Sequence, residues 1–420
     1  MKPKLLTTLP DYTSRLFLGD LLAGISVAMV AIPLSIAIAI ASGAPPATGL
    51  VTAIVAGFLI SALGGSRVQI GGPTGAFIVV VYGVIAEHGY DGLVLATLMA
   101  GAILVIAGLL RAGNLIAYVP EAVVNGFTIG IAVVIASSQL KDLLGIEATG
   151  VPADFIPKMA TLWAARATAD WTSVGAGLAT LALMVLLRRR WPKLPDRLIG
   201  PLLVSIAAAL VLLPVNTIAS QYGALPRSMP MPSLPHVSIA RMGELMPSAF
   251  VIAFLAAIES LLSAMVADRM IGGSHRPNAE VLAQGWANIG SGLFGGLPAT
   301  GAIARTATNV RAGGKTPVAG MIHAVVILGV MLLAAPLAGY LAMPALAALL
   351  MMTAWNMSEP HKWKDYWKSP NEERLLLLLT LLLTVLADLT VAIGVGVGFG
   401  LALRLRQSKL QAEEWHTPEP

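Results

Sequence analysis

The sequence predicts an all-α polytopic membrane protein, built as two inverted repeats. Three observations predict this fold. The 420 residues are 56% hydrophobic and 12% charged, whereas soluble proteins carry about 25% charged residues. Apolar runs of about 20 residues, the length that crosses a bilayer as a helix, recur along most of the chain. Two interrupted segments, 64–81 and 295–314, share a glycine pair, a short extended piece and Thr-Gly-Ala.

Composition and motifs exclude several classes of function. The chain has no cysteine, which excludes disulfides, thiol catalysis and cysteine metal sites. The formal charge of +5 comes from Lys and Arg in particular loops and indicates no nucleic-acid partner. Neither a Walker A loop, a metal-spaced histidine set nor a nucleophile elbow is present in the sequence. We therefore expect a protein that is not an enzyme, holds no cofactor or metal, and works from an ion gradient.

The first half contains seven predicted elements after a basic lead at 1–19. They are 20–42, 46–63, a half-helix at 74–86, 92–110, 120–140, 171–188 and 198–214. Pro33 in the middle of the first run predicts a kink or an unwound point. The mixed stretch 142–170 predicts an external loop with a short surface helix.

The second half repeats this plan after a proline-rich connector. Its elements are 248–268, 279–293, a half-helix at 301–311, 316–336, 343–355, 374–388 and 389–405. An odd number of elements in each half inverts the second copy relative to the first. The predicted units are a first repeat at 1–214, a connector at 215–247, a second repeat at 248–407 and a cytoplasmic tail at 408–420.

The placement of basic residues predicts the orientation. If the N-terminus is cytoplasmic, every even-numbered span ends inside, and those ends carry most of the Lys and Arg. These residues are Arg67, Arg111, Arg188, Arg189, Arg190, Arg269, Arg276, Arg311, Lys315, Lys362, Lys364, Lys368, Arg404 and Arg406. The opposite ends carry Glu87, Asp91, a loop of mixed charge at 142–170, and uncharged turns near 43–46 and 336–344. The positive-inside rule then predicts an inner membrane protein with both termini cytoplasmic.

The half-helix at 301–311 is predicted to begin inside the membrane. A Gly/Pro break followed by Thr300 indicates a helix start that the Thr hydroxyl could cap. Eleven residues make roughly 16 Å of helix, about half of the hydrocarbon core. Its N-terminus would present free N–H groups and partial positive charge near the midplane, beside Arg305. The pair of such segments in the two halves points to a transporter's binding site, and chance recurrence is the alternative.

Glu259 is the most notable ionisable residue within a predicted span. A carboxylate at that depth is costly and is a functional candidate. Ser263 lies four residues further on and faces the same side of the helix. Two readings stay open: Glu259 takes up a coupling proton or sodium ion, or it forms a permanent ion pair with Arg305.

Several stretches together resemble the sulfate permease (SulP) family of anion transporters. They are GDLLAGISVAMVAIPLSIAIAIASG, GGSRVQIGGPTGAF, AAIESLL, GGLPATGAIARTATNVRAG and TAWNMSE. The resemblance implies fourteen spans in two inverted seven-span repeats, with half-helices at spans 3 and 10. It also implies a core domain at 20–111 and 248–336, a gate domain at 115–214 and 343–407, and a homodimer.

The resemblance also implies a binding site between the facing N-termini of spans 3 and 10. The matching substrate-binding residues are Thr74, Gly75, Ala76, Phe77, Thr300, Gly301, Ala302, Ile303 and Arg305. Glu259 matches the acidic position of span 8 that is linked to ion coupling, with Ser263 beside it.

Details of the pattern predict the substrate. Plant and animal-type sulfate carriers have Pro-Gln in the first span, where this chain has Pro33-Leu34. The pattern more closely resembles a bacterial branch that carries four-carbon dicarboxylates with protons. We therefore expect proton-coupled, elevator-type uptake of dicarboxylates such as fumarate or succinate. The alternatives are a sodium-coupled bicarbonate or sulfate transporter, a nucleobase permease and an anion channel. Most members carry a STAS domain after the last span. The end at Pro420 predicts either a shortened chain, which we favour, or a form without that domain.

Overall fold

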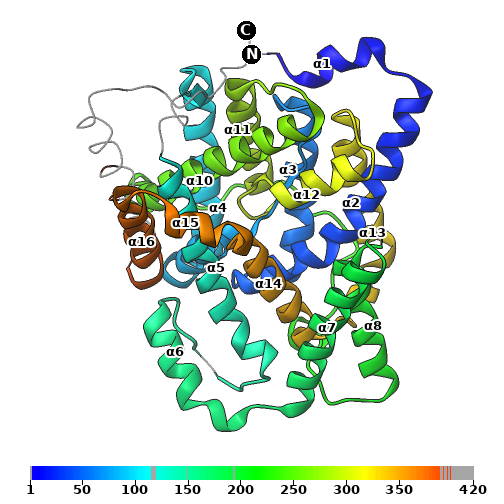
Figure 1. Ribbon diagram of the computed structural model, residues 1–420, viewed down its shortest axis with the longest axis vertical. Coiled ribbons are helices and arrows are strands. Elements are labelled where there is room, and N and C mark those ends of the chain that lie inside the picture. The colour runs from blue at the N-terminus through cyan, green and yellow to red at the C-terminus, as the bar shows by residue number, and fades with distance from the viewer. Residues whose placement is uncertain are drawn as a thin grey trace.

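The computed structural model describes residues 2–387 except 115–119, 149 and 193, together with the single positions 391, 395 and 398. Seven of the described helical segments are long and apolar enough to span a membrane: α2 (Ser14–Ala41), α3 (Pro46–Leu63), Gly75–Leu109, α5 (Glu121–Leu143), α7 (Trp171–Arg190), α10 (Ile239–Ile271) and α13 (Val318–Ala338). The chain is therefore a multi-pass membrane protein (Figure 1). The count of fourteen spans stays a prediction, and its last element at 389–405 lies almost wholly outside the described residues.

The span Gly75–Leu109 consists of η2 (Gly75–Phe77) and the kinked helix α4 (Ile78–Leu109), and the other helices of the described chain are shorter. They are α1 (Lys4–Thr8), η1 (Leu9–Asp11), α6 (Phe155–Ala164), η4 (Arg166–Thr168), α8 (Asp196–Leu210), α9 (Ile218–Tyr222), α11 (Pro277–Leu293), α12 (Ile303–Arg311), α14 (Met343–Met357), η5 (Pro360–Lys362), α15 (Trp363–Lys368) and α16 (Asn371–Leu386). The predicted surface helix between 142 and 170 is α6, so that expectation is confirmed.

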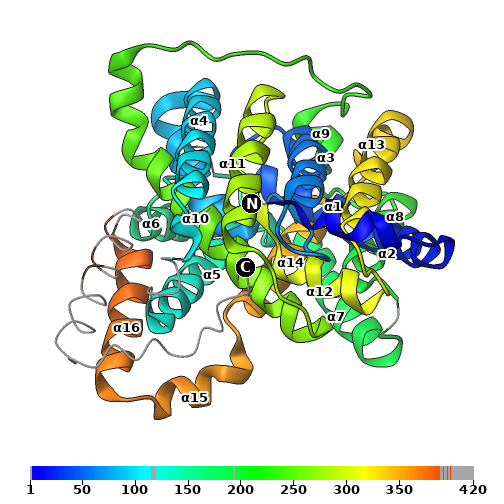
Figure 2. The ribbon, with the colours of Figure 1, turned by 90° about the horizontal axis from the view of Figure 1, so that it is seen from above.

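The helices pack in two sets that meet mainly along α2 and η2. In one set, α4 packs on α10 and α11, and α3 packs on α2, α11 and α13. In the other, α5 packs on α14 and α16, and α7 packs on α8 and α14. Viewed from above, α5 and α16 lie side by side at one edge, and α2 and α13 lie at the other (Figure 2). In both ribbon views α12 lies near the middle of the molecule.

One pair of two-residue strands joins the halves of the chain. Strand β1 (Gly71–Gly72) pairs antiparallel with β2 (Thr300–Gly301), with Gly71 opposite Gly301. Each strand is buried and leads directly into a helix, η2 and α4 after β1 and α12 after β2. The two glycine-interrupted segments, about 230 positions apart in the chain, therefore meet at one place.

The start of the second half-helix differs from the prediction. Helix α12 begins at Ile303, and its N-cap Ala302 makes no side-chain cap. Thr300 is extended in β2, and its hydroxyl donates to the carbonyl of Ala256 on α10 at 2.8 Å. The prediction that Thr300 caps the helix is wrong, because the strand pairing carries the backbone two residues further before it turns. The first half-helix ends at a kink at Gly89, where φ is 70°.

The first span also differs in one respect. Helix α2 runs without a break through Pro33, which is buried. The prediction of an unwound point there is therefore wrong. Helices α2 and α3 pack closely just after Pro33. A Cβ added at Gly49 of α3 would overlap the carbonyl of Ser35 on α2. Only glycine permits that approach of the two helices.

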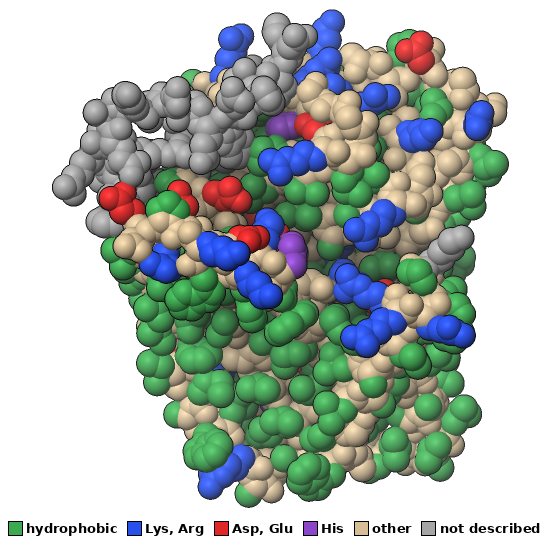
Figure 3. Space-filling model, viewed as in Figure 1, with side chains coloured by type: hydrophobic (Ala, Val, Ile, Leu, Met, Phe, Trp, Pro, Cys, Tyr) green, Lys and Arg blue, Asp and Glu red, His purple; other side chains and the backbone are tan. Residues whose placement is uncertain are grey.

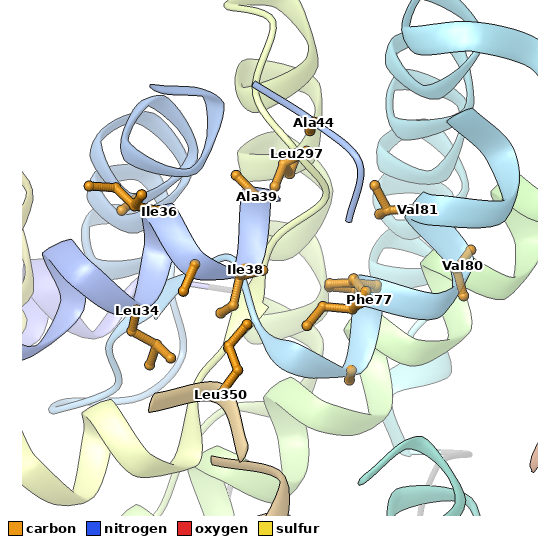
Figure 4. Close-up of a cluster of buried hydrophobic side chains, with 14 of the residues drawn as sticks. Leu34, Ile36, Ile38, Ala39, Ala44, Phe77, Val80, Val81, Leu297 and Leu350 are labelled. Atoms are coloured by element: carbon orange, nitrogen blue, oxygen red, sulfur yellow. The ribbon is translucent and has the colours of Figure 1, made fainter. Parts of the chain in front are cut away.

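An apolar core surrounds the strand crossing. Leu34 and Ile38 of α2, Phe77 of η2 and Leu350 of α14 belong to one buried cluster (Figure 4). Outside, hydrophobic side chains cover most of the lower half of the face in Figure 3, and Lys and Arg gather mainly in the upper half. This division is expected for a surface that meets lipid over part of its height.

Helix α6 is held by a buried lysine. The amine of Lys158, whose residue is 5% exposed, donates to Ser138 Oγ of α5 at 2.8 Å and lies 5.8 Å from the centre of the Tyr82 ring. The Tyr82 hydroxyl of α4 donates to the carbonyl of Val151 at 2.7 Å. Burial lowers the pKa of Lys158 to about 8, although Asp154 acts in the opposite direction.

This shift predicts a pH dependence of stability. Unfolded lysine keeps a pKa near 10.5, so between about pH 8 and pH 10.5 the unfolded chain binds more protons than the folded one. The contribution of Lys158 to the free energy of unfolding is therefore fully present above about pH 10.5, and it is lost as pH falls through the folded pKa of Lys158, about 8. We expect the melting temperature of the wild type to rise relative to that of Lys158→Met from pH 8 to pH 10. Parallel melting curves over that range would contradict the assignment.

Candidate functional site

A cavity of about 990 Å³ lies against the strand crossing. Eight of the residues predicted from the sequence line it: Thr74, Gly75, Ala76, Gly301, Ala302, Ile303, Arg305 and Glu259. Three other predicted residues, Phe77, Thr300 and Ser263, are buried and do not line it. Phe77 packs in the apolar core (Figure 4), and Thr300 and Ser263 make hydrogen bonds within the protein. The cavity therefore collects residues from both halves.

Arg305 is the main cation at this crossing. Its side chain is buried, with 2% of the residue exposed, and Nη2 donates to Ser35 Oγ at 3.1 Å and to the Pro73 carbonyl at 3.0 Å. Its Nε and Nη1 have no hydrogen-bond partner, and it makes no ion pair with a carboxylate of the described residues. Buried arginines are normally paired. Two donors thus stay available for an anion.

Glycine at position 72 makes room for this guanidinium. A Cβ on Gly72 would overlap Arg305 Nη1, and its φ of 147° is one that other residues rarely adopt. The strand β1 can therefore pass directly over the arginine. This close approach brings the Thr-Gly-Ala segment that follows β1 to the same cavity as Arg305.

The starts of η2 and α12 add partial positive charge. The first N–H groups of a helix lack partners within the helix and carry the positive end of its dipole. The N–H of Ala302 donates to the Ile70 carbonyl at 2.8 Å, so the free donors of α12 begin one residue later. Ile303 is 43% exposed, and it lines the cavity at this end.

Glu259 lines the same cavity from α10. Its Oε2 accepts a hydrogen bond from Thr74 Oγ1 at 3.0 Å. No ion pair joins Glu259 to Arg305 in the described part of the chain, so the permanent pair considered from the sequence is absent there. Glu259 and Arg305 thus both face the cavity without forming an ion pair with each other.

Ser263 does not share the surroundings of Glu259. Its Oγ lies 3.1 Å from Thr306 Oγ1 of α12, and that threonine oxygen accepts from the N–H of Ile70 at 3.1 Å. Ser263 therefore links α10 to α12 by a hydrogen bond, and through Thr306 to Ile70, the residue before β1.

Sequence reasoning missed a buried polar network beside the crossing. Glu280 of α11 is fully buried, and its Oε2 accepts from the N–H groups of Gly65 at 2.8 Å and Ser66 at 3.2 Å. Its Oε1 accepts from Ser260 Oγ and from Gln284 Nε2, each at 2.9 Å. The four donors satisfy the carboxylate and fix the segment that leads into β1.

Gln69 connects this network to the crossing. Its Nε2 donates to Ser260 Oγ at 2.7 Å, and its amide packs directly against Gly301. The polar residues Glu280, Gln284 and Asn288 recur every four positions along 277–293. Such spacing places them on one helix face and was a signal available in the sequence.

The mouth of the cavity is charged and mostly paired. His275 Nδ1 lies 2.6 Å from Asp268 Oδ2, and Lys362 Nζ lies 3.0 Å from Glu359 Oε2. These residues also line the cavity. A small anion that enters here meets these paired side chains before it reaches Arg305, which has no ion-pair partner among the described residues.

Comparisons with known proteins agree with this arrangement. A sequence profile described as the Sulfate permease family matches residues 17–380. YvdB of Bacillus subtilis, for which the name suggests sulfate as substrate, is 42% identical over 380 residues, which are 90% of this chain and 72% of YvdB. The bicarbonate transporter BicA of Picosynechococcus is 30% identical over 381 residues, 88% of this chain and 67% of BicA.

Solved structures show the same fold. The transmembrane domain of a cyanobacterial BicA has a TM-score of 0.81 at 29% identity, covering 91% of this chain and 99% of that domain. The murine anion transporter Slc26a9 has a TM-score of 0.85 at 20% identity, covering 96% of this chain and 71% of that one. The all-helical polytopic fold predicted from the sequence is confirmed at this level.

Proposed function

Since the chain belongs to the sulfate permease family, we propose that it carries a small oxyanion, sulfate or bicarbonate, across a cell membrane by secondary transport. The observation that carries the proposal is Arg305, a buried guanidinium with two unpartnered nitrogens beside the crossing of the two halves. Arg offers several N–H donors in a planar fork that suits oxyanions. The adjacent helix starts add partial positive charge at the same place.

The choice of sulfate or bicarbonate corrects the expectation of a dicarboxylate. That expectation rested on short motifs in the spans and found no support among the relatives, whose names give sulfate and bicarbonate. The contacts offered by the site are mainly N–H groups, which recognise negative charge and size. Fumarate therefore stays a competitor to be tested beside the two oxyanions.

An elevator-type cycle fits the two sets of helices. In this proposal the core domain, 20–111 and 248–336, carries Arg305 and the bound anion past the gate domain, 115–214 and 343–407. The termini lie in the cytoplasm, the protein resides in the inner membrane, and two copies form a homodimer. Glu259, which faces the anion site through Thr74, takes up the coupling proton or sodium ion.

Uptake into proteoliposomes tests the function. Labelled sulfate, bicarbonate and fumarate would each be supplied with an imposed proton or sodium gradient. We expect saturable uptake of sulfate or bicarbonate that follows one of the two gradients. Uptake of fumarate alone would overturn the oxyanion assignment, and flux that never saturates would indicate a channel.

The role of Glu259 predicts a separation of two activities. Glu259→Gln keeps a hydrogen-bond acceptor for Thr74 but cannot bind a cation as a carboxylate does. We expect this variant to lose gradient-driven accumulation and to keep anion exchange across the vesicle membrane. The matched control is Glu244→Gln, an exposed position on the same helix α10. Accumulation at the wild-type level in Glu259→Gln would exclude it as the coupling group.

A further inference from the structure

Besides Arg305 and the exposed Arg269 of α10, a third arginine lines the cavity from another part of the chain. Arg197 lies in the first turn of α8 and is only partly exposed. Its guanidinium has no hydrogen-bond or ion-pair partner among the residues that the structure describes. Arg305 belongs to α12, so the two cations reach one cavity from different helix sets.

The charges around Arg197 are mostly of its own sign. Arg188, Arg305 and Arg311 lie close enough to act on it electrostatically, and Asp196 is the carboxylate that opposes them. Two carboxylates elsewhere in the cavity are already used, Asp268 by His275 and Glu359 by Lys362. Like charges brought together at a half-buried site repel one another. An anion held at Arg197 would relieve that repulsion.

We propose that Arg197 forms a second anion subsite, which binds the second negative charge of a divalent oxyanion such as sulfate while Arg305 binds the first. The proposal rests on the anion-transport function above and deepens it by naming the charge class of the substrate. A monovalent anion satisfies Arg305 alone and leaves Arg197 in water. Each planar guanidinium can hold an oxyanion by two parallel hydrogen bonds. The cavity then discriminates by charge as well as by size.

The position of Arg197 also gives the subsite a direction. In the proposed cycle Arg305 moves with the core domain, and Arg197 stays with the gate domain. The two arginines therefore share one cavity in the arrangement seen here and separate as the core moves. A divalent anion binds more tightly on the side of the membrane to which this cavity opens, and a monovalent anion shows little such preference.

The test compares two anions in one variant. Arg197→Gln removes the charge and keeps N–H donors, and Arg189→Gln is the control, because Arg189 is exposed on the neighbouring α7 and does not line the cavity. We expect the apparent KM for sulfate to rise roughly tenfold in Arg197→Gln, the loss of about one charged hydrogen-bonding partner. The value for bicarbonate should change less than about twofold, and both should stay unchanged in Arg189→Gln.

Other outcomes would overturn the subsite. An equal rise in KM for both anions would mean that Arg197 only attracts negative charge towards the mouth. No change for either anion would mean that Arg197 is a solvated surface residue.

A binding measurement separates this proposal from the proposed function. Sulfate should raise the melting temperature of the purified wild type more than nitrate does, and Arg197→Gln should lose this difference. The melting temperature can be measured even if vesicles show no uptake. Absence of uptake would overturn the proposed transport of sulfate or bicarbonate, and the melting temperatures would still test the subsite. Equal stabilisation of the wild type by sulfate and nitrate would overturn the subsite itself.

Discussion

Arg305→Gln is expected to abolish concentrative anion uptake without lowering the stability of the fold. Removing one partner of a buried charged interaction costs about 2 kcal/mol or more of binding free energy, which lowers the affinity for the anion by more than roughly thirtyfold. Arg305 makes no ion pair with a described carboxylate, and it leaves Nε and Nη1 unpartnered. A buried charge without a counter-charge destabilises a folded protein. The glutamine variant should therefore melt at the wild-type temperature or above it.

The combination of lost uptake and kept stability is the informative result. Lys315→Gln provides the control, because Lys315 is exposed shortly after the end of the same helix α12 and does not line the cavity. Uptake by labelled anion and melting temperature would be measured on the same preparations. A variant at Arg305 that transports normally would remove the anion site from this cavity, and one that fails to fold would make Arg305 a structural residue.

The parts of the site that sequence predicted are those with a local signal. Gly-Gly breaks, the Thr-Gly-Ala repeat and Arg305 stand out in an apolar chain, and the structure places them at one crossing. Glu259 was visible for the same reason, as a charge within an apolar run. Helix α3 was predicted to the residue from where its apolar run ends. Helix α10 is longer than its apolar run, because it begins at Ile239 and not at the predicted 248.

The parts that sequence missed depend on contacts between distant segments. Thr300 looks like a helix cap when only its neighbours are considered, but pairing with β1 keeps it extended. The carboxylate of Glu280 is satisfied by N–H groups more than 200 positions away in the chain. Arg197 was not singled out from the sequence, where it directly precedes the predicted span at 198–214, and only the packed fold brings it to the same cavity as Arg305. Local pattern cannot reveal such pairings.

Gly301→Ala is expected to disrupt the crossing itself. The new Cβ would overlap Gln69 Nε2, whose donated bond to Ser260 belongs to the network around Glu280. Moving Gln69 leaves buried polar groups unpaired, at a cost of about 1–3 kcal/mol. Moving β2 instead separates Gly301 from Gly71 and displaces Arg305, which follows about one helical turn later in the chain. We expect a lower melting temperature and loss of most uptake.

A double variant distinguishes these two causes. If the clash with Gln69 is responsible, Gln69→Ala combined with Gly301→Ala should recover part of the melting temperature that Gly301→Ala loses. Gly329→Ala is the control, because a Cβ there meets no atom within 4 Å and helix α13 tolerates alanine. Losses that simply add in the double variant would mean that the two residues do not constrain each other. Recovery would instead show that the amide of Gln69 and the missing side chain at Gly301 together fix where β2 ends and α12 begins, and hence where Arg305 meets the anion.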